Sequence, residues 1–182
     1  MRWVIGWAAP VAFAAPHGGT VCAGQLFSQA FLAQGDTHFY TPLPGGEFNS
    51  AGEGWTLSGG ASVVKAIRPD GSVGGVLNLP EHASALSPPL CVTLAYPMAR
   101  AWVAGGDVSV AVSYAGTASE LAPESVNGLK TKHGEWTLGK FGIAPALGGA
   151  EDAPREVRFL FSRAHKGPAQ VYGVYVDPRM TH

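Results

Sequence analysis

The stretch PGGEFNSAGEGWTLSGGASVV, residues 44–64, combines six glycines, one tryptophan and a closing pair of valines. Glycine accepts the positive φ values that tight turns need, so its density here predicts a chain that changes direction repeatedly. Valine favours the pleated, half-buried backbone of a strand. The stretch therefore predicts a turn-rich opening that leads into the first strand of a β-rich domain.

Downstream of this stretch, apolar residues recur with a period of two. In residues 108–114 the three valines and Tyr114 share one face and the small residues share the other, as in a strand with one buried face. Other short strands, bounded by turn signals such as Pro69-Asp70-Gly71, are expected at 61–66, 76–79, 90–95, 100–104, 136–143, 156–161 and 170–176. Such a series without intervening helices predicts a β-sandwich or barrel.

Two segments have no clear strand pattern. Residues 115–134 are polar and contain glycine, so we expect them to form a long connection. Residues 25–33 hold an apolar set that could form one face of a two-turn helix. The same residues could instead form a strand that leads into the fold.

The composition is that of a globular chain with few charges. Its 182 residues are the size of a single domain. Charged residues make up 14% of the chain, whereas ~25% is usual. Twelve basic and thirteen acidic side chains give a formal charge of -1, and no segment gathers the basic ones. A nucleic-acid binder needs a basic patch, so we expect no nucleic acid among the partners.

The N-terminus has the pattern of a secretory signal peptide. Arg2 is followed by an uncharged apolar run that ends at Ala15, with Ala12-Phe13-Ala14 as a cleavage-like triplet. The run is too short to cross a membrane, which takes ~20 residues. We therefore expect a secreted, extracellular protein without a transmembrane segment. A retained apolar arm, buried as a strand or helix, is the alternative for residues 1–15.

The predicted organisation has three parts. Residues 1–15 form the signal peptide or apolar arm, residues 16–41 an N-terminal extension, and residues 42–182 the β domain. Cys22 and Cys91 are the two cysteines, and an even number in a secreted chain favours a disulfide. Two free thiols or half of a metal site are the alternatives, but zinc is disfavoured because the CxxC spacing is absent.

Three stretches resemble carbohydrate-binding modules and related galactose-binding-like jelly rolls. GGEFNSAGEGWTLSGGASVV is similar to the opening of those modules, where a Phe-Glu-x-Gly segment precedes a tryptophan and the first strand. SPPLCVTLAYPMARAWVAGG resembles their middle hairpin, and QVYGVYVDP their last strand. The resemblance covers about residues 42–178 and extends to uncharacterised secreted bacterial proteins. It implies an all-β jelly-roll β-sandwich of about eight antiparallel strands.

The resemblance also implies a structural calcium, which this sequence supports poorly. In such modules an acidic residue after the opening phenylalanine, with an acid of the last strand, helps to hold the ion. Here Asn49 follows Phe48, and Tyr172-Gly173 stand in place of the paired acids. Calcium needs six to eight oxygen ligands. We therefore expect no cofactor, with Glu47 and Asn49 as the candidate ligands if calcium is bound.

Glycan recognition by a sandwich needs exposed aromatic faces and a few polar groups. The candidate ligand-binding residues are Trp102, Trp136, Tyr96 and Arg100, with Tyr40 as a further rim residue. Trp102 and Arg100 share strand parity, opposite Ala101 and Val103. This parity leaves two places open for Trp102, the core or a concave outer surface. Trp55, among glycines near the first strand, is expected in the core.

The sequence holds no catalytic motif. The six histidines lie in expected loops or termini, and Asp36-Thr37-His38 and Glu81-His82 are the two close acid–histidine pairs. No GxSxG elbow is present. We expect a secreted, non-catalytic module that binds an extracellular ligand, with a glycan as the first choice. The alternative is a structural subunit that self-associates into an extracellular filament, coat or surface layer.

Overall fold

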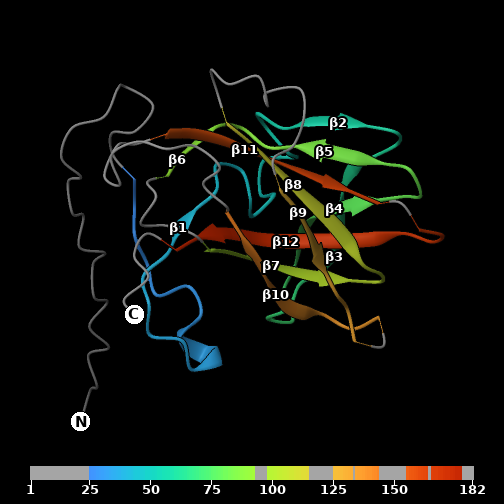
Figure 1. Cartoon of the computed structure of the whole chain (residues 1–182). Coiled ribbons are helices and arrows are strands. Elements are labelled where there is room, and N and C mark those ends of the chain that lie inside the picture. Colours follow the sequence, from blue (N-terminus) through green and yellow to red (C-terminus); the bar gives the residue numbers. More distant parts are fainter. Residues whose placement is uncertain are drawn as a thin grey trace, which may run out of the picture.

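The computed structural model describes residues 25–92, 98–114, 125–132, 134–143, 155–163 and 165–177. In these ranges the chain forms two antiparallel sheets that pack face to face (Figure 1). The helical content of the described residues is a single 3-10 turn, Leu32–Gln34. The predicted all-β sandwich is confirmed.

The first sheet has a row of five strands, most of whose neighbours are not consecutive along the chain, and a sixth strand that pairs beside the row. The order is β10 (Thr137–Gly142), β7 (Met98–Ala104), β12 (Ala169–Val176), β4 (Val73–Leu79) and β3 (Ser62–Ile67), and β1 (Thr41–Pro42) also pairs with β12.

The second sheet is built in the same way. The order is β2 (Thr56–Ser58), β5 (Ser84–Leu86), β11 (Arg155–Ser162), β8 (Val108–Tyr114) and β9 (Ser125–Leu129), and β6 (Leu90–Val92) also pairs with β11. Eight of the described strands have five residues or more and four are shorter. The longer set matches the expected number of strands.

The structure corrects two expectations about the connections. The segment 115–134 is not wholly a loop, because β9 lies inside it and pairs with five residues of β8. Residues 25–33 form neither a two-turn helix nor a regular strand: Ser28 makes an isolated bridge with Tyr40, and one 3-10 turn follows. Asn and Gly in β9 weaken its strand pattern, so the pairing with β8 decides its conformation.

The core lies between the sheets and comes from alternating strand residues. β8 contributes its three valines and β11 contributes Val157, Phe159 and Phe161, all fully buried. Trp55 is 8% exposed and packs against Phe48 and Phe161, with ring centroids 5.0 and 5.8 Å away. Its indole Nε1 donates a hydrogen bond to the Pro44 carbonyl at 3.1 Å. The expectation that Trp55 belongs to the core is confirmed.

The loop that precedes Phe48 lies beside β12. β12 pairs with β4 only from Ala169 to Val171, and its register with β7 shifts between Tyr172 and Tyr175. Beyond that point Gly46 takes the place of β4, because its carbonyl accepts hydrogen bonds from the amides of Gly173 and Val174 at 3.0 and 3.3 Å. This arrangement brings Glu47 to the outer side of the first sheet.

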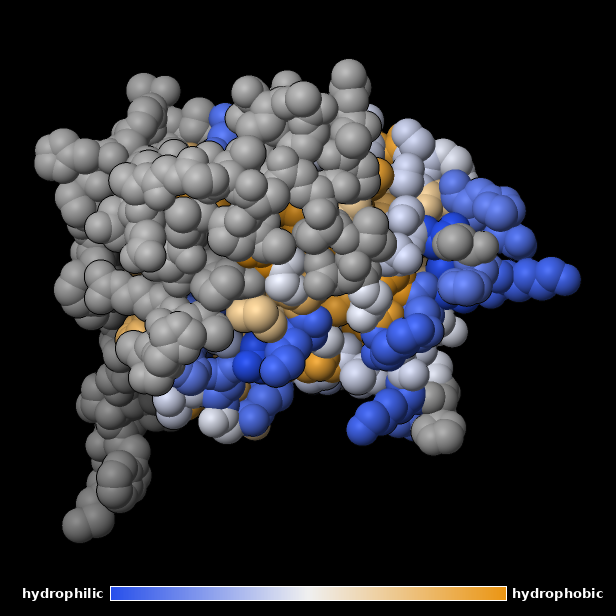
Figure 2. Space-filling view, in the orientation of Figure 1, coloured by the Kyte–Doolittle hydropathy of each residue, from blue (hydrophilic) through white to orange (hydrophobic). Residues whose placement is uncertain are grey.

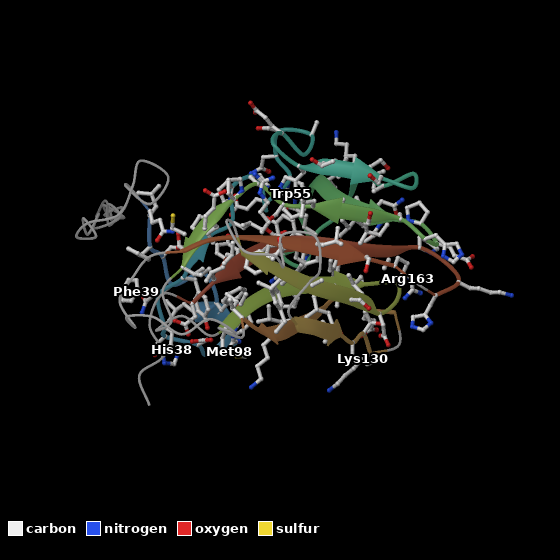
Figure 3. All side chains as sticks on the ribbon, turned by 45° about the horizontal axis from the view of Figure 1, so that its top comes forward. His38, Phe39, Trp55, Met98, Lys130 and Arg163 are labelled. Atoms are coloured by element: carbon white, nitrogen blue, oxygen red, sulfur yellow. The ribbon has the colours of Figure 1, made fainter. Side chains whose placement is uncertain are left out.

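Residues 25–42, blue in Figure 1, pack against one end of the first sheet. Phe31 is 1% exposed and makes edge-on ring contacts with Tyr40 and Tyr175, at 4.8 and 5.3 Å between centroids. Tyr40 is also 1% exposed, so its expected place on a ligand-binding rim is wrong. Figure 3 shows His38 and Phe39 of this segment near Met98, and Lys130 and Arg163 toward the opposite end.

Candidate ligand-binding site

The outer face of the first sheet carries the predicted aromatic residues. In β7, Ala99, Ala101 and Val103 are fully buried against the core. Side chains alternate across a strand, so Arg100 and Trp102 point outward, and both are half-buried. The shared parity of the two residues is confirmed, and the structure places Trp102 on the outer face rather than in the core.

Three side chains form a row across this face. Trp102 stands in register with Tyr172 of β12 on one side and with Leu138 of β10 on the other. Residues directly opposite on antiparallel strands have Cβ atoms about 5 Å apart. We call Trp102 and Tyr172, flanked by the aliphatic Leu138, the aromatic row. Tyr172 was not among the predicted ligand-binding residues, although its parity in QVYGVYV could have identified it.

Tyr172 is covered on one side by a cation. The Arg68 guanidinium carbon lies 4.7 Å from the centre of the Tyr172 ring. Burial raises the pKa of the Tyr172 hydroxyl, and the nearby Arg68 charge opposes this rise. The phenol is therefore neutral at neutral pH and can donate a hydrogen bond.

Trp136 joins the two edges of the first sheet. It directly precedes β10, and its indole Nε1 donates a hydrogen bond to the carbonyl of Ile67, the last residue of β3, at 2.9 Å. β10 and β3 lie at opposite ends of the strand order, so the sheet must curve to allow this bond. The indole N–H is thus occupied, whereas the half-buried ring keeps part of its surface accessible.

Two amides lie beside the aromatic row. Gln170 of β12 and Asn78 of β4 are register partners, and Gln170 shares the outer face with Tyr172 because it is two residues away. Both side chains are half-buried. Within the described part of the chain, neither of these two side-chain amide groups makes a hydrogen bond. Their donors and acceptors are therefore available to a ligand, a feature that the sequence alone did not indicate.

Arg100 is engaged with the N-terminal segment. Its guanidinium lies 2.8 Å from the Asp36 carboxylate and 5.7 Å from the ring centres of both Phe31 and Tyr40. Burial acts to raise the pKa of Asp36, but hydrogen bonds from Tyr40 and His38 and the Arg100 charge lower it to about 2. A ligand-binding role for Arg100 stays a prediction. Tyr96 lies outside the described residues.

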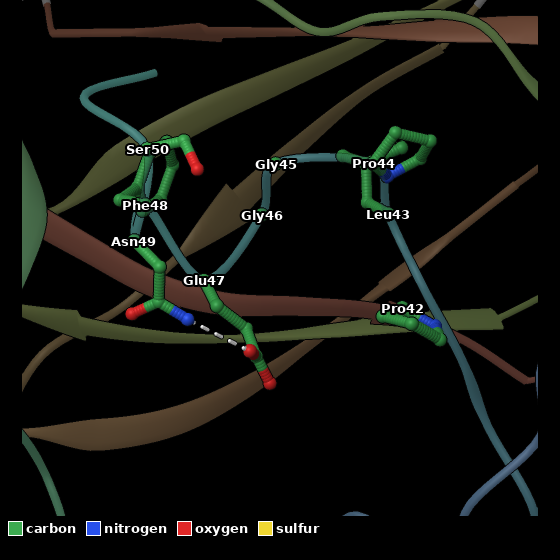
Figure 4. Close-up of a pocket in the computed structure, with 9 residues that line it drawn as sticks. All are labelled: Pro42, Leu43, Pro44, Gly45, Gly46, Glu47, Phe48, Asn49 and Ser50. Atoms are coloured by element: carbon green, nitrogen blue, oxygen red, sulfur yellow. Dashed lines mark hydrogen bonds between the residues drawn. The ribbon is translucent and has the colours of Figure 1, made fainter. Parts of the chain in front are cut away.

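Glu47 and Asn49 line a hollow of ≈ 280 Å³ formed by residues 42–50 (Figure 4). Asn49 Nδ2 donates to Glu47 Oε2 at 3.2 Å, and the Tyr175 hydroxyl donates to Glu47 Oε1 at 2.5 Å. Both carboxylate oxygens are thus already hydrogen-bonded. Among the residues that the structure describes, no group of three or more histidine, cysteine or acidic side chains could hold a metal ion.

One acid–histidine pair belongs to the N-terminal segment and the other to an exposed turn. His38 Nδ1 is 2.7 Å from Asp36 Oδ1, but the other oxygen of Asp36 faces Arg100 and Tyr40. His82 Nε2 and Glu81 Oε1 are 3.5 Å apart at an exposed turn. In Figure 2 the right-hand end of the described surface is mainly hydrophilic.

Cys91 is buried, with 4% of its surface exposed, whereas Cys22 lies outside the described residues together with all of residues 1–24. The Cys22–Cys91 disulfide and the signal peptide therefore stay predictions. Within the described ranges, no helix has the length and apolarity needed to span a membrane.

No family model matches this sequence, and no curated protein matches it. Among solved structures, several carbohydrate-binding modules are similar to the chain. One is the CBM22-2 xylan-binding domain of Paenibacillus barcinonensis Xyn10C, at 12% identity and a TM-score of 0.49. That likeness covers 73% of this chain and 97% of the other.

Two further structures represent the range of these likenesses. CsCBM6-3 from Clostridium stercorarium, in complex with cellobiose, is 14% identical with a TM-score of 0.44, over 69% of this chain and 87% of the module. The K1 cleaved adhesin domain of Lys-gingipain from Porphyromonas gingivalis W83 is 13% identical with a TM-score of 0.49, over 74% and 96%. The fold class rests on the two antiparallel sheets themselves rather than on these likenesses.

Proposed function

We propose that this domain is a non-catalytic module that binds a glycan on the outer face of the first sheet. The observation that carries the proposal is the aromatic row, in which Trp102 and Tyr172 stand in register, beside the unpaired amides of Gln170 and Asn78. Aromatic faces supply apolar contact area, and a few polar groups fix the orientation of a ligand. A sugar ring presents both C–H surfaces and hydroxyl groups, so it matches this combination.

The edges of the face add polar contacts. Lys140 follows Leu138 by two residues on β10 and is exposed. It can donate up to three hydrogen bonds to hydroxyl or carboxylate oxygens. Trp136 at the start of β10 extends the apolar surface. A linear glycan could therefore lie across the row and meet polar groups on two sides.

The proposal includes an extracellular setting, supported by the signal-like residues 1–15. It also includes the absence of catalysis, supported by the lack of a GxSxG elbow or other catalytic motif in the sequence. His38 and Asp36 belong to the segment that holds Arg100. They serve there to dock the N-terminal segment on the sheet.

A glycan array with the purified protein, run once with calcium and once with a chelator, tests the proposal. Binding to one glycan class that persists with the chelator is the expected result. Binding that the chelator abolishes would support the glycan module but contradict a metal-free site. A broad array without any binding would overturn the proposal. Hydrolysis of a bound glycan, detected by mass spectrometry, would contradict the non-catalytic part.

Self-association is the second candidate, and one observation favours it. Leu26, Leu32 and Phe39 are each more than half exposed on the N-terminal segment, and exposed apolar groups often mark contact surfaces. Light scattering of the purified protein distinguishes the two candidates. A monomer that binds glycan supports the first, whereas concentration-dependent assemblies without glycan binding support the second.

A further inference from the structure

Arg68 binds the loop that carries the candidate calcium ligands. It directly follows β3, and its Nη2 donates to Asn49 Oδ1 at 2.6 Å and to the Glu47 carbonyl at 3.1 Å. The same nitrogen and Nε donate to the Gly75 carbonyl at 3.2 and 3.3 Å. A single guanidinium thus collects three oxygens from the loop and from β4.

These oxygens fit a metal ion poorly. The candidate side-chain oxygens of Glu47 and Asn49 all have hydrogen-bond donors: Tyr175 and Asn49 for the carboxylate, and Arg68 for the amide. Calcium takes six to eight oxygens, several of them carboxylate. The donor set offers one carboxylate, and the Arg68 guanidinium already binds the Asn49 side-chain oxygen and the Glu47 carbonyl. The calcium that the family resemblance implies does not fit these residues.

Two consecutive glycines make room for this arrangement. A Cβ atom on Gly74 would lie 2.4 Å from Cζ of Arg68, and one on Gly75 would lie 2.1 Å from the Phe48 carbonyl oxygen. Any side chain at either position would displace the guanidinium or the loop. Phe48 itself has φ = 53°, which is unusual for a bulky residue. Its 1% exposed side chain anchors the loop in the core.

We propose that the Arg68 guanidinium replaces a structural metal ion in this domain. It ties the loop 47–49 to β4 and at the same time covers Tyr172 of the aromatic row. A guanidinium is permanently charged and offers five N–H donors in a fixed plane. Charge-assisted hydrogen bonds are the stronger class, so one side chain supplies both the charge and the geometry. The proposal does not depend on glycan binding.

Thermal unfolding of three proteins tests this inference: the wild type, Arg68→Ala, and Arg158→Ala as the matched control. Arg158 is an exposed arginine on β11. We expect the wild-type Tm to stay constant when millimolar calcium or a chelator is added. We expect Arg68→Ala to lower the Tm by about 5 °C, since several charge-assisted hydrogen bonds are lost, and Arg158→Ala to leave it nearly unchanged.

Methylguanidinium at millimolar concentration supplies the specific readout, since denaturation by guanidinium needs molar amounts. It should restore part of the lost Tm in Arg68→Ala and have no effect on the wild type. Three results would each overturn the proposal: a wild-type Tm that rises with calcium, an Arg68→Ala Tm equal to that of the control, or a lowered Tm that methylguanidinium leaves unchanged. Should Arg68→Ala fail to fold, calorimetric titration of the wild type with calcium decides, because measurable binding contradicts the proposal.

Discussion

The Asp36 carboxylate and the Arg100 guanidinium, 2.8 Å apart, fasten the N-terminal segment to the outer side of β7. The Tyr40 hydroxyl donates to the same carboxylate at 2.7 Å. Asp36 is thus the common partner of one strand residue and two residues of its own segment, Tyr40 and His38. Its charge state should decide how firmly the segment is held.

Acid should therefore weaken the fold through Asp36. The folded-state pKa is lowered from 3.8 to about 2, so this group stabilises the fold above its ordinary pKa. The contribution is lost as the pH falls from 3.8 toward 2. We expect the wild-type Tm to drop over this range and Asp36→Asn, already less stable at neutral pH, to drop less. Glu53→Gln, at an exposed site, serves as the control and should lose as much Tm over this range as the wild type. Equal drops in wild type and Asp36→Asn would contradict the assignment.

The aromatic row should dominate ligand affinity. Trp102→Ala and Tyr172→Ala should each weaken binding of a glycan found on the array about tenfold, because a lost aromatic contact costs about 1.4 kcal/mol. Isothermal titration calorimetry measures the change. Phe39→Ala removes an aromatic residue that is 54% exposed but belongs to the N-terminal segment. It should leave the affinity unchanged, and a loss equal to that of Trp102→Ala would place the site elsewhere.

A methyl group at residue 75 should destabilise the domain. The Cβ atom of Gly75→Ala would lie 2.1 Å from the Phe48 carbonyl oxygen, so the loop must move and the Arg68 contacts are strained. Overpacking of this kind costs about 1–3 kcal/mol. Gly128→Ala in β9 is the control, because its Cβ would meet only Cε of Lys130, at 3.8 Å. Denaturant unfolding should show a lower midpoint for the first variant alone, and equal midpoints would refute the expected clash.

The two cysteines should form a disulfide in the secreted protein. Gln25, three residues after Cys22, donates its Nε2 hydrogen to the Cys91 carbonyl at 2.7 Å, which favours the pairing. Closing this loop stabilises by roughly 4 kcal/mol in the chain-entropy model. Intact mass should be lower by the two hydrogens lost on oxidation, and a reductant should lower the Tm. A mass that corresponds to two thiols would disprove the bridge.

Most long strands could be predicted from local pattern. Residues 108–114 were expected as one strand and form β8 with those bounds, and 170–176 differs from β12 by one residue. Strict alternation and flanking turn signals carry this information within a few residues. The short strands β2 and β5 were missed, since three residues hold too little pattern. Their conformation comes from pairing with each other and with β11.

The site was predicted only in part because its contacts are distant in sequence. Trp102 is a candidate from its residue type, although its strand parity leaves its face open. Its partner Tyr172 depends on the register between β7 and β12. The Tyr175–Glu47 hydrogen bond spans 128 residues. Register is set by the whole sheet rather than by a local motif, so neither pairing is visible in the sequence alone.

The strand order also has a consequence for how the domain folds. β11 and β12, the last strands along the described chain, occupy the centres of the two sheets (Figure 1). Each sheet can be completed only after its own central strand has been synthesised, β12 for the first sheet and β11 for the second. Non-local pairing of this kind folds slowly. We expect ribosome-stalled chains that end at residue 154 to be digested readily by protease and full-length released chains to resist. Resistance of the stalled chains would contradict this order of folding.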